Sequence, residues 1–132
     1  MKRVILGTGV WSDFPTIKGI IYPKDVLESI IYNESIRNRL SNGNMVGGIL
    51  SQSNTIKPLN GVTTHVVTDI QLYKGEVVVE IEYLDIEMVH KHITTPEAAV
   101  IFKCPMDQPN YFGVINKIED IYTVHIRERR SI

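Results

Sequence analysis

Two alternating runs of apolar residues, joined by a two-residue turn, constrain this chain more than any other feature of its sequence. The first run places four residues on one face: Val66, Thr68, Ile70 and Leu72. The second does the same with Val77, Val79, Ile81 and Tyr83. Because Lys74-Gly75 stands between the runs, the pattern predicts an antiparallel β-hairpin with one face of each arm on the core. The opposite face of the second arm should be partly wet, since it carries Glu76, Val78, Glu80 and Glu82.

The segment before the hairpin predicts one strand and one helix. Residues 3–11 are apolar and β-branched at their start and contain two glycines, which predicts a short, bent strand. A helix is expected from Pro23, because proline suits the first turn and an acidic residue follows at Asp25. Its apolar side recurs at helical spacing through Ile31 and continues to Leu40, so we expect one helix that ends at residues 41–44.

Several shorter elements complete the pattern. We expect strands at residues 45–50 and 98–104, a helical turn within 88–95, and two closing strands at 111–115 and 118–126. Residues 51–61 and 105–110 should be loops because they are polar and contain proline, asparagine or glycine. The whole chain, 1–132, therefore reads as one α+β domain of mostly antiparallel strands with one main helix.

Charge and cysteine content exclude several classes of protein. The chain has 14 basic and 15 acidic residues, a net charge of −1, so it lacks the basic surplus that binding to nucleic acid requires. No stretch approaches the roughly 20 apolar residues of a membrane-spanning helix. Cys104 is the single cysteine and cannot form an internal disulfide. We expect a soluble protein made in a reducing compartment.

No cofactor or metal motif is complete in the sequence. Gly7-Thr8-Gly9 resembles part of a dinucleotide-binding fingerprint, but Ser12 stands where the third glycine should, and the expected helix is replaced by Asp13-Phe14-Pro15. His90 and His92 would share a side of an extended segment, yet no third ligand is near. The predicted protein therefore uses neither a cofactor nor a metal.

The remaining candidates for catalysis are histidines and nucleophiles without a recognisable motif. His65 begins the hairpin and is expected to be a structural histidine, hydrogen-bonded at the sheet surface beside Asp69. Ser51 and Ser53 lack a nucleophile-elbow sequence. Cys104 has no local signature and is expected to be a small, buried apolar residue. Taken alone, these residues indicate only a soluble globular α+β domain.

Three segments in order resemble the head-maturation (prohead) proteases of tailed bacteriophages. Tyr22-Pro23 followed by Leu27 matches the Tyr-Pro-x-x-x-Leu helix entry of that family. The segment Gly47–Gln52 then stands in the place of the family's Gly-Glu-Leu-x-His-Pro strand, and a hairpin follows that turns at Gly75. The likeness covers about residues 15–104 and implies a herpesvirus-protease-like fold, a small barrel-like β-sheet with helices packed around it.

The resemblance fails at the catalytic positions. Ser51 stands where the family has its catalytic histidine. Ile101 stands where the family's Gly-Val-Ser-x-Arg-Gly strand has its serine nucleophile, and Lys103-Cys104 replaces the Arg-Gly that follows. A serine nucleophile depends on a base, and the members of such a unit fail together. The resemblance therefore implies an inactive member of the family.

From this we predict a non-catalytic virion protein, made in the host cytoplasm, that binds the major capsid protein as an auxiliary, decorating or cementing subunit. A homo-oligomer on the capsid is a second partnership that this prediction allows. Candidate partner-binding residues lie in two loops and the basic tail: Lys57, Asn60, Asp107, Gln108, Asn110, Arg127, Arg129 and Arg130. The main alternative is an active head-maturation peptidase that uses His65 with Ser51, Ser53 or Cys104. A further alternative is a barrel that binds a small ligand in a deep apolar pocket.

Overall fold

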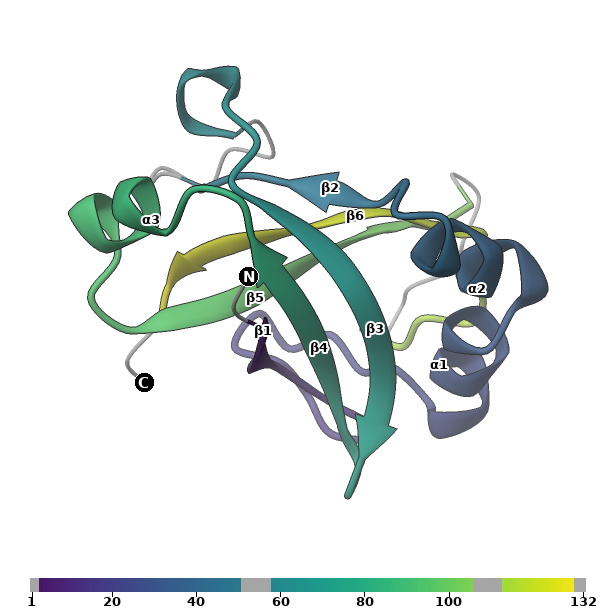
Figure 1. Cartoon of the computed structure of the whole chain (residues 1–132). Helices are drawn as coiled ribbons and strands as arrows, with labels where there is room; N and C mark the ends of the chain where they lie inside the picture. The colour runs from purple at the N-terminus through teal and green to yellow at the C-terminus, as the bar shows by residue number, and fades with distance from the viewer. Residues whose placement is uncertain (1–2, 51–57, 106–112, 130–132) are drawn as a thin grey trace.

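Six strands and three short α-helices make up the part of the chain that the computed structural model describes, residues 3–50, 58–105 and 113–129 (Figure 1). In chain order the elements are β1 (Arg3–Trp11), α1 (Lys24–Ile31), α2 (Glu34–Ser41), β2 (Val46–Gly47), the 3-10 turn η1 (Leu59–Gly61), β3 (His65–Tyr73), β4 (Glu76–Tyr83), α3 (Ile86–His92), β5 (Pro96–Lys103) and β6 (Asp120–Glu128). None of these helices is long and apolar enough to cross a membrane. The α+β class with antiparallel strands is confirmed.

The strands form two sheets that together make a half-barrel (Figure 1). One sheet has the order β1-β4-β3-β2, and the other pairs β5 with β6. The segment that follows β2 joins the two sheets by pairing with β6. Leu50 N–H donates to Ile126 O at 2.8 Å, and Ile126 N–H donates to Gly48 O at 2.9 Å. On the other side β1 and β5 lie close together but belong to different sheets. In the described residues, backbone hydrogen bonds close the junction between β2 and β6, whereas β1 and β5 pack side by side without a shared ladder.

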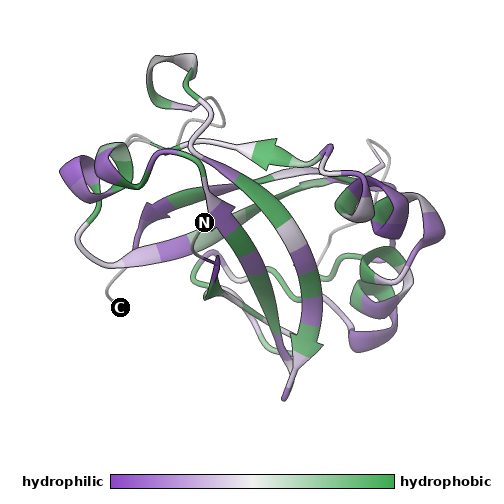
Figure 2. Ribbon diagram, in the orientation of Figure 1, coloured by the Kyte–Doolittle hydropathy of each residue, from purple (hydrophilic) through white to green (hydrophobic). Residues whose placement is uncertain are grey.

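The hairpin turn and its second arm are as predicted. Lys74 and Gly75 have φ values of 51° and 91°, the left-handed conformations of a two-residue turn whose twist matches that of the strands. Along β4, alternate residues from Val77 to Tyr83 are buried against the core. Figure 2 shows the resulting alternation of hydrophilic and hydrophobic residues along β3 and β4.

The prediction that Val66 and Thr68 face the core at the beginning of the first arm is wrong. Val67 and Ile70 are fully buried, whereas Val66 and Thr68 are only half-buried. The cause is a β-bulge: Val67 pairs with Ile81 and Asp69 with Glu80, so one extra residue stands between them. A single inserted residue reverses the side of the sheet that every residue before it faces.

The single predicted helix is two helices. α1 ends at Ile31, and Asn33 then starts α2 as an N-cap, its side chain accepting a hydrogen bond from Ser35 N–H at 2.8 Å. A side-chain acceptor at this position satisfies a backbone donor that a new helix leaves free. The break rotates the apolar side, so that Leu27 and Ile36 are both buried although they lie on different helices.

The remaining elements shift from their predicted bounds. The strand expected at 45–50 is reduced to β2, the helical turn near 88–95 is α3, and the two later strands are β5 and β6. Of the strand expected at 111–115, residues 111–112 lie outside the described part, and Val114 forms an isolated bridge with Ile21. The core combines the inner faces of both sheets with α1 and α2.

Helix α2 connects the two sheets through two arginines. Arg37 donates to Asp69 Oδ1 at 2.8 Å, to Ile31 O at 3.0 Å, and to Ile70 O. Arg39 donates to Ile121 O at 2.7 Å and to Tyr122 O at 2.8 Å. Each guanidinium thus ties α2 to backbone carbonyls of a different sheet.

We expect Arg37→Lys to destabilise the protein by about 2 kcal/mol, because lysine keeps the charge but cannot reach an aspartate and two carbonyls with one planar fork. Urea unfolding measures the change. The matched control is Arg3→Lys, whose side chain is 60% exposed and lies 3.7 Å and 3.8 Å from its carboxylate partners. This exposed pair should contribute at most about 1 kcal/mol. Equal losses in the two variants would contradict the role of Arg37.

Candidate functional site

Of the two positions that correspond to the catalytic residues of the prohead proteases, the structure describes one. Ser51, like Ser53, lies outside the described residues. Ile101 lies on β5, half-buried and paired in register with Thr123 of β6. Its side chain offers no atom that could attack a carbonyl or carry a proton.

The prediction that His65 lies at the sheet surface is wrong, because its side chain is fully buried. The bulge after Val67 turns His65 toward the interior, where its Nε2 lies 2.7 Å from Val124 O. Because a carbonyl can only accept, Nε2 carries the proton and Nδ1 accepts from the Thr64 hydroxyl at 3.0 Å. Burial lowers the pKa of His65 to about 4, an effect opposed by the bond to Val124 and reinforced by nearby His125. The ring is therefore neutral at pH 7.

The Thr64–His65 pair has the spacing of a nucleophile and its base, but not the access. The hydroxyl–imidazole distance of 3.0 Å is within the reach that general-base catalysis needs. Both side chains are 0% exposed, and neither lines the groove described below. A peptide in solvent cannot contact the Thr64 hydroxyl, so this pair holds β3 to β6.

His125 and the two glycines of β2 form the second part of this buried cluster. His125 is 6% exposed, and its Nδ1 accepts a hydrogen bond from Gly48 N–H at 3.0 Å. A Cβ atom on Gly47 would lie 2.1 Å from Val124 O and 2.8 Å from His65 Nε2. Only glycine permits this approach of β2 to β6. No local sequence pattern predicts the cluster, although Gly47-Gly48 signals close backbone contact.

The remaining titratable candidates show no activation for catalysis. Burial, and secondarily the carboxylate of Glu119, raises the pKa of Cys104, which therefore stays a thiol at pH 7. Cys104 packs on the core, although it is only partly buried. His90 and His92 are exposed on α3, and no group of side chains in the described ranges could hold a metal ion.

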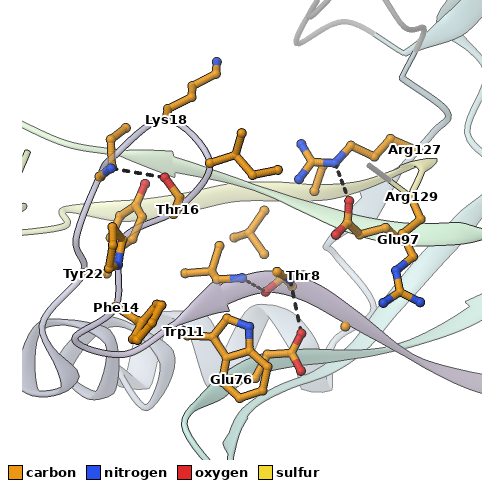
Figure 3. A pocket seen from close by; sticks show the side chains of 18 of the residues that line it. Thr8, Trp11, Phe14, Thr16, Lys18, Tyr22, Glu76, Glu97, Arg127 and Arg129 are labelled. Carbon is orange, nitrogen blue, oxygen red and sulfur yellow. Dashed lines mark hydrogen bonds and ion pairs between the residues drawn. The ribbon is translucent and has the colours of Figure 1, made fainter. Parts of the chain in front are cut away.

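A groove of about 940 Å³ lies on the described surface (Figure 3). It lies between β1, the segment 14–22, the outer side of β5 and the end of β6. Three exposed apolar side chains line it: Trp11, Phe14 and Ile17, with exposures of 45%, 65% and 63%. Tyr22 and Phe102 pack against each other at the same surface, with ring centroids 5.1 Å apart.

Only part of the predicted partner-binding set can be compared with this groove. Arg127 and Arg129 both line it. The backbone of Asn60 lies in η1. The other five lie outside the described residues: Lys57, Asp107, Gln108, Asn110 and Arg130.

The floor of the groove is an irregular part of β1. Its pairing with β4 shifts register between Gly7 and Trp11, and Gly9 has a φ of 73°. Side chains replace the interrupted ladder: Glu76 Oε2 accepts from Gly9 N–H at 3.2 Å, and Thr8 Oγ1 accepts from Val10 N–H at 3.1 Å. Side chains thus fix the bulge where it lies beside β5.

No family model matches this sequence, and no curated protein matches it either. Among solved structures, the chain is similar to the bacteriophage T4 capsid assembly protease, gp21, with a TM-score of 0.72 and 11% sequence identity. The superposition covers 97% of this chain and 82% of the protease. The chain has the fold of this protease. At 11% identity the likeness establishes the fold, which confirms the expected prohead-protease-like architecture, and leaves activity to be argued from residues.

Proposed function

We propose that this chain is a catalytically silent phage head protein that binds the major capsid protein as an auxiliary or decorating subunit. One observation carries the proposal: the fold of a capsid assembly protease extends over 97% of the chain, while the position that corresponds to the serine nucleophile in the family resemblance holds Ile101. On this proposal the protein is made in the host cytoplasm and resides in the virion.

The chemistry of the described residues supports the proposal that the chain has no peptidase activity. Peptide hydrolysis by acyl transfer needs a nucleophile and an adjacent base that takes its proton. Ile101 supplies no nucleophile. His65 has both ring nitrogens engaged by Val124 and Thr64, in a site closed to solvent. Loss of one member of a catalytic unit removes most of its rate enhancement.

Two observations support a capsid partner. The protein of similar fold is a capsid assembly protease, so this architecture already acts during the assembly of a phage head. The chain has a net charge of −1, which disfavours packaged nucleic acid as its target. A protein surface is then the partner that remains, and a domain without catalytic groups can serve by binding alone.

Co-expression with the major capsid protein from the same genome tests the proposal. We expect the intact chain to sediment with assembled heads, and the capsid protein and scaffold to keep their full masses. A serine-directed fluorophosphonate probe should leave the chain unlabelled. As a matched control, the double variant Ser51→Ala, Ser53→Ala should behave like the wild type.

Two results would overturn the proposal. Shortened capsid or scaffold protein that returns to full length with Ser51→Ala, Ser53→Ala would show an active peptidase. A chain that stays in the supernatant while heads sediment would show that it does not bind the capsid.

A further inference from the structure

The loop between β1 and α1, residues 12–22, is held in one position although this described segment contains no named helix or strand. Ser12 N–H donates to Gly75 O at 2.7 Å, which fixes the beginning of the loop to the hairpin turn. Ile21 N–H donates to Gly113 O at 2.6 Å, which fixes the end of the loop to a distant part of the chain. The loop therefore presents its side chains in fixed positions, and a partner that binds them need not order the backbone first.

The tip of this loop is a β-turn with an apolar residue at its corner. Gly19 N–H donates to Thr16 O at 2.8 Å, so Ile17 and Lys18 are the two central residues of the turn. Such positions usually hold glycine, proline, asparagine, aspartate or serine. Ile17 is largely exposed to solvent there, so packing within the domain does not explain an isoleucine at this position.

Ile17 belongs to a larger exposed apolar surface. Trp11, at the end of β1, and Phe14, near the start of the loop, are exposed as well, and all three side chains line the groove. We call these three residues the Trp11 surface; Figure 3 shows Trp11 and Phe14 at the same end of the groove. Apolar side chains gathered in this way, next to polar ones, mark a site of protein interaction. Aromatic residues often contribute most of the binding energy at such sites.

The Trp11 surface is accessible to side chains of a partner, whereas the backbone of β5 is not. Strand β1 runs beside β5, and Tyr22 packs on Phe102 with ring centroids 5.1 Å apart. The edge of β5 is therefore covered. A partner can contact the exposed Trp11 surface without displacing β1 or Tyr22.

The charges around the Trp11 surface favour an acidic partner. Both carboxylates among the lining residues are engaged within the chain: Glu97 pairs with Arg127 at 3.1 Å, and Glu76 accepts a backbone hydrogen bond at 3.2 Å. Lys18 and Arg129 also line the groove, and no described carboxylate lies within ion-pair distance of either. Figure 3 shows these two cations on opposite sides of the groove, where they complement carboxylates of a partner. Five charged lining residues also argue against the deep apolar pocket expected for a barrel that binds a small ligand.

We propose that the Trp11 surface, bordered by Lys18 and Arg129, binds a protein partner through a segment that is apolar in its middle and acidic at its ends. The apolar side chains of that segment cover Trp11, Phe14 and Ile17, and its carboxylates pair with the two cations. The identification of this partner with the capsid protein rests on the proposed function above. The position of the surface and the chemistry of its partner rest on the described residues alone.

Fluorescence of Trp11 reports occupancy of the surface, because Trp11 is the only tryptophan of the chain. The probe is a short synthetic peptide with phenylalanine and leucine in the middle and aspartates at both ends. We expect a saturable change in emission. A peptide with lysines in place of the aspartates should bind at least about tenfold more weakly. Unchanged emission, or equal binding of the two peptides, would overturn the inference.

One double variant tests the apolar contribution. Phe14→Ser with Ile17→Ser should weaken the acidic peptide at least about tenfold, because it removes two of the three apolar contacts. Both residues are exposed, so the urea midpoint should stay close to that of the wild type. Leu84→Ser is the matched control, since Leu84 is apolar and exposed but lies outside the groove lining. Full affinity of the double variant would contradict the role of the Trp11 surface.

A second double variant tests the charges. Lys18→Glu with Arg129→Glu should weaken the acidic peptide at least about tenfold and strengthen the lysine peptide. Lys91→Glu, on α3 and outside the groove lining, is the matched control and should change neither. An unchanged preference for the acidic peptide in the double variant would show that the two cations do not select the partner.

A sedimentation experiment with assembled heads distinguishes this inference from the proposed function. If the wild type and both double variants bind heads equally well, the surface assignment is wrong and the function stands. If the acidic peptide binds at Trp11 but the chain does not bind heads, the surface is correct and the capsid partner is wrong.

Discussion

Gly47→Ala should destabilise the protein by about 3 kcal/mol or more, the largest loss that we expect from adding a single methyl group. The added Cβ would lie 2.1 Å from the carbonyl oxygen of Val124 and 2.8 Å from His65 Nε2. Both atoms are held by a hydrogen bond to each other, so neither can yield without cost. The backbone of β2 would have to move away from β6, and that movement would strain the only hydrogen-bonded junction between the sheets in the described residues.

Gly43→Ala is the matched control for this measurement. Gly43 has a φ of 69°, but no atom lies within 4 Å of an added Cβ. Its replacement should therefore cost only about 1 kcal/mol, from backbone strain. Urea unfolding of both variants gives the comparison. Similar losses would mean that β2 is not clamped against β6 at Gly47.

Acidification should destabilise the protein through His65 by about 3 kcal/mol between pH 6.5 and pH 4. The pKa of His65 is lowered from 6.5 to about 4 in the folded state, chiefly by burial. Above pH 6.5 the ring is neutral in both the folded and the unfolded chain, and the stability it supports is fully present. As the pH falls below 6.5, His65 becomes protonated in the unfolded chain but stays neutral in the folded chain. The free energy of unfolding therefore decreases until the pH reaches the pKa of His65 in the folded state.

The variant His65→Gln isolates this effect from the titration of carboxylates. Glutamine keeps an N–H donor for Val124 O but does not titrate in this range. We expect the wild type to be more stable than the variant at pH 7 and the difference to shrink by about 3 kcal/mol at pH 4. Chemical denaturation at several pH values measures it. Parallel stability profiles for the two proteins would show that His65 is not the acid-sensitive group.

Local patterns predicted the hairpin well because its stabilising contacts are close in sequence. The turn at Lys74-Gly75 and the buried side of β4 followed directly from composition and alternation. The bulge in β3 did not, since an extra residue leaves the local alternation of apolar residues almost unchanged and is fixed by the neighbouring strand. The helix break was not predicted either, although Asn33, a strong N-cap residue, stands inside the otherwise helical pattern.

Local sequence patterns could not predict the buried cluster or the groove, because both depend on residues far apart in the sequence. His65 meets Val124 across 59 positions of sequence, and Gly48 meets His125 across 77. No periodicity reports such contacts. The groove likewise depends on the approach of β1 to β5, and of the predicted partner-binding residues the described structure places Arg127 and Arg129 there.

The position of β6 in the fold has a consequence for biosynthesis. This last strand supplies Val124 to His65, Ile126 to Gly48 and two carbonyls to Arg39, all of which lie in the first half of the chain. A nascent polypeptide that still lacks β6 leaves these groups without their native partners and the apolar inner face of β3 and β4 open to water. Folding must therefore finish after β6 has been translated, and until then the exposed apolar face favours aggregation.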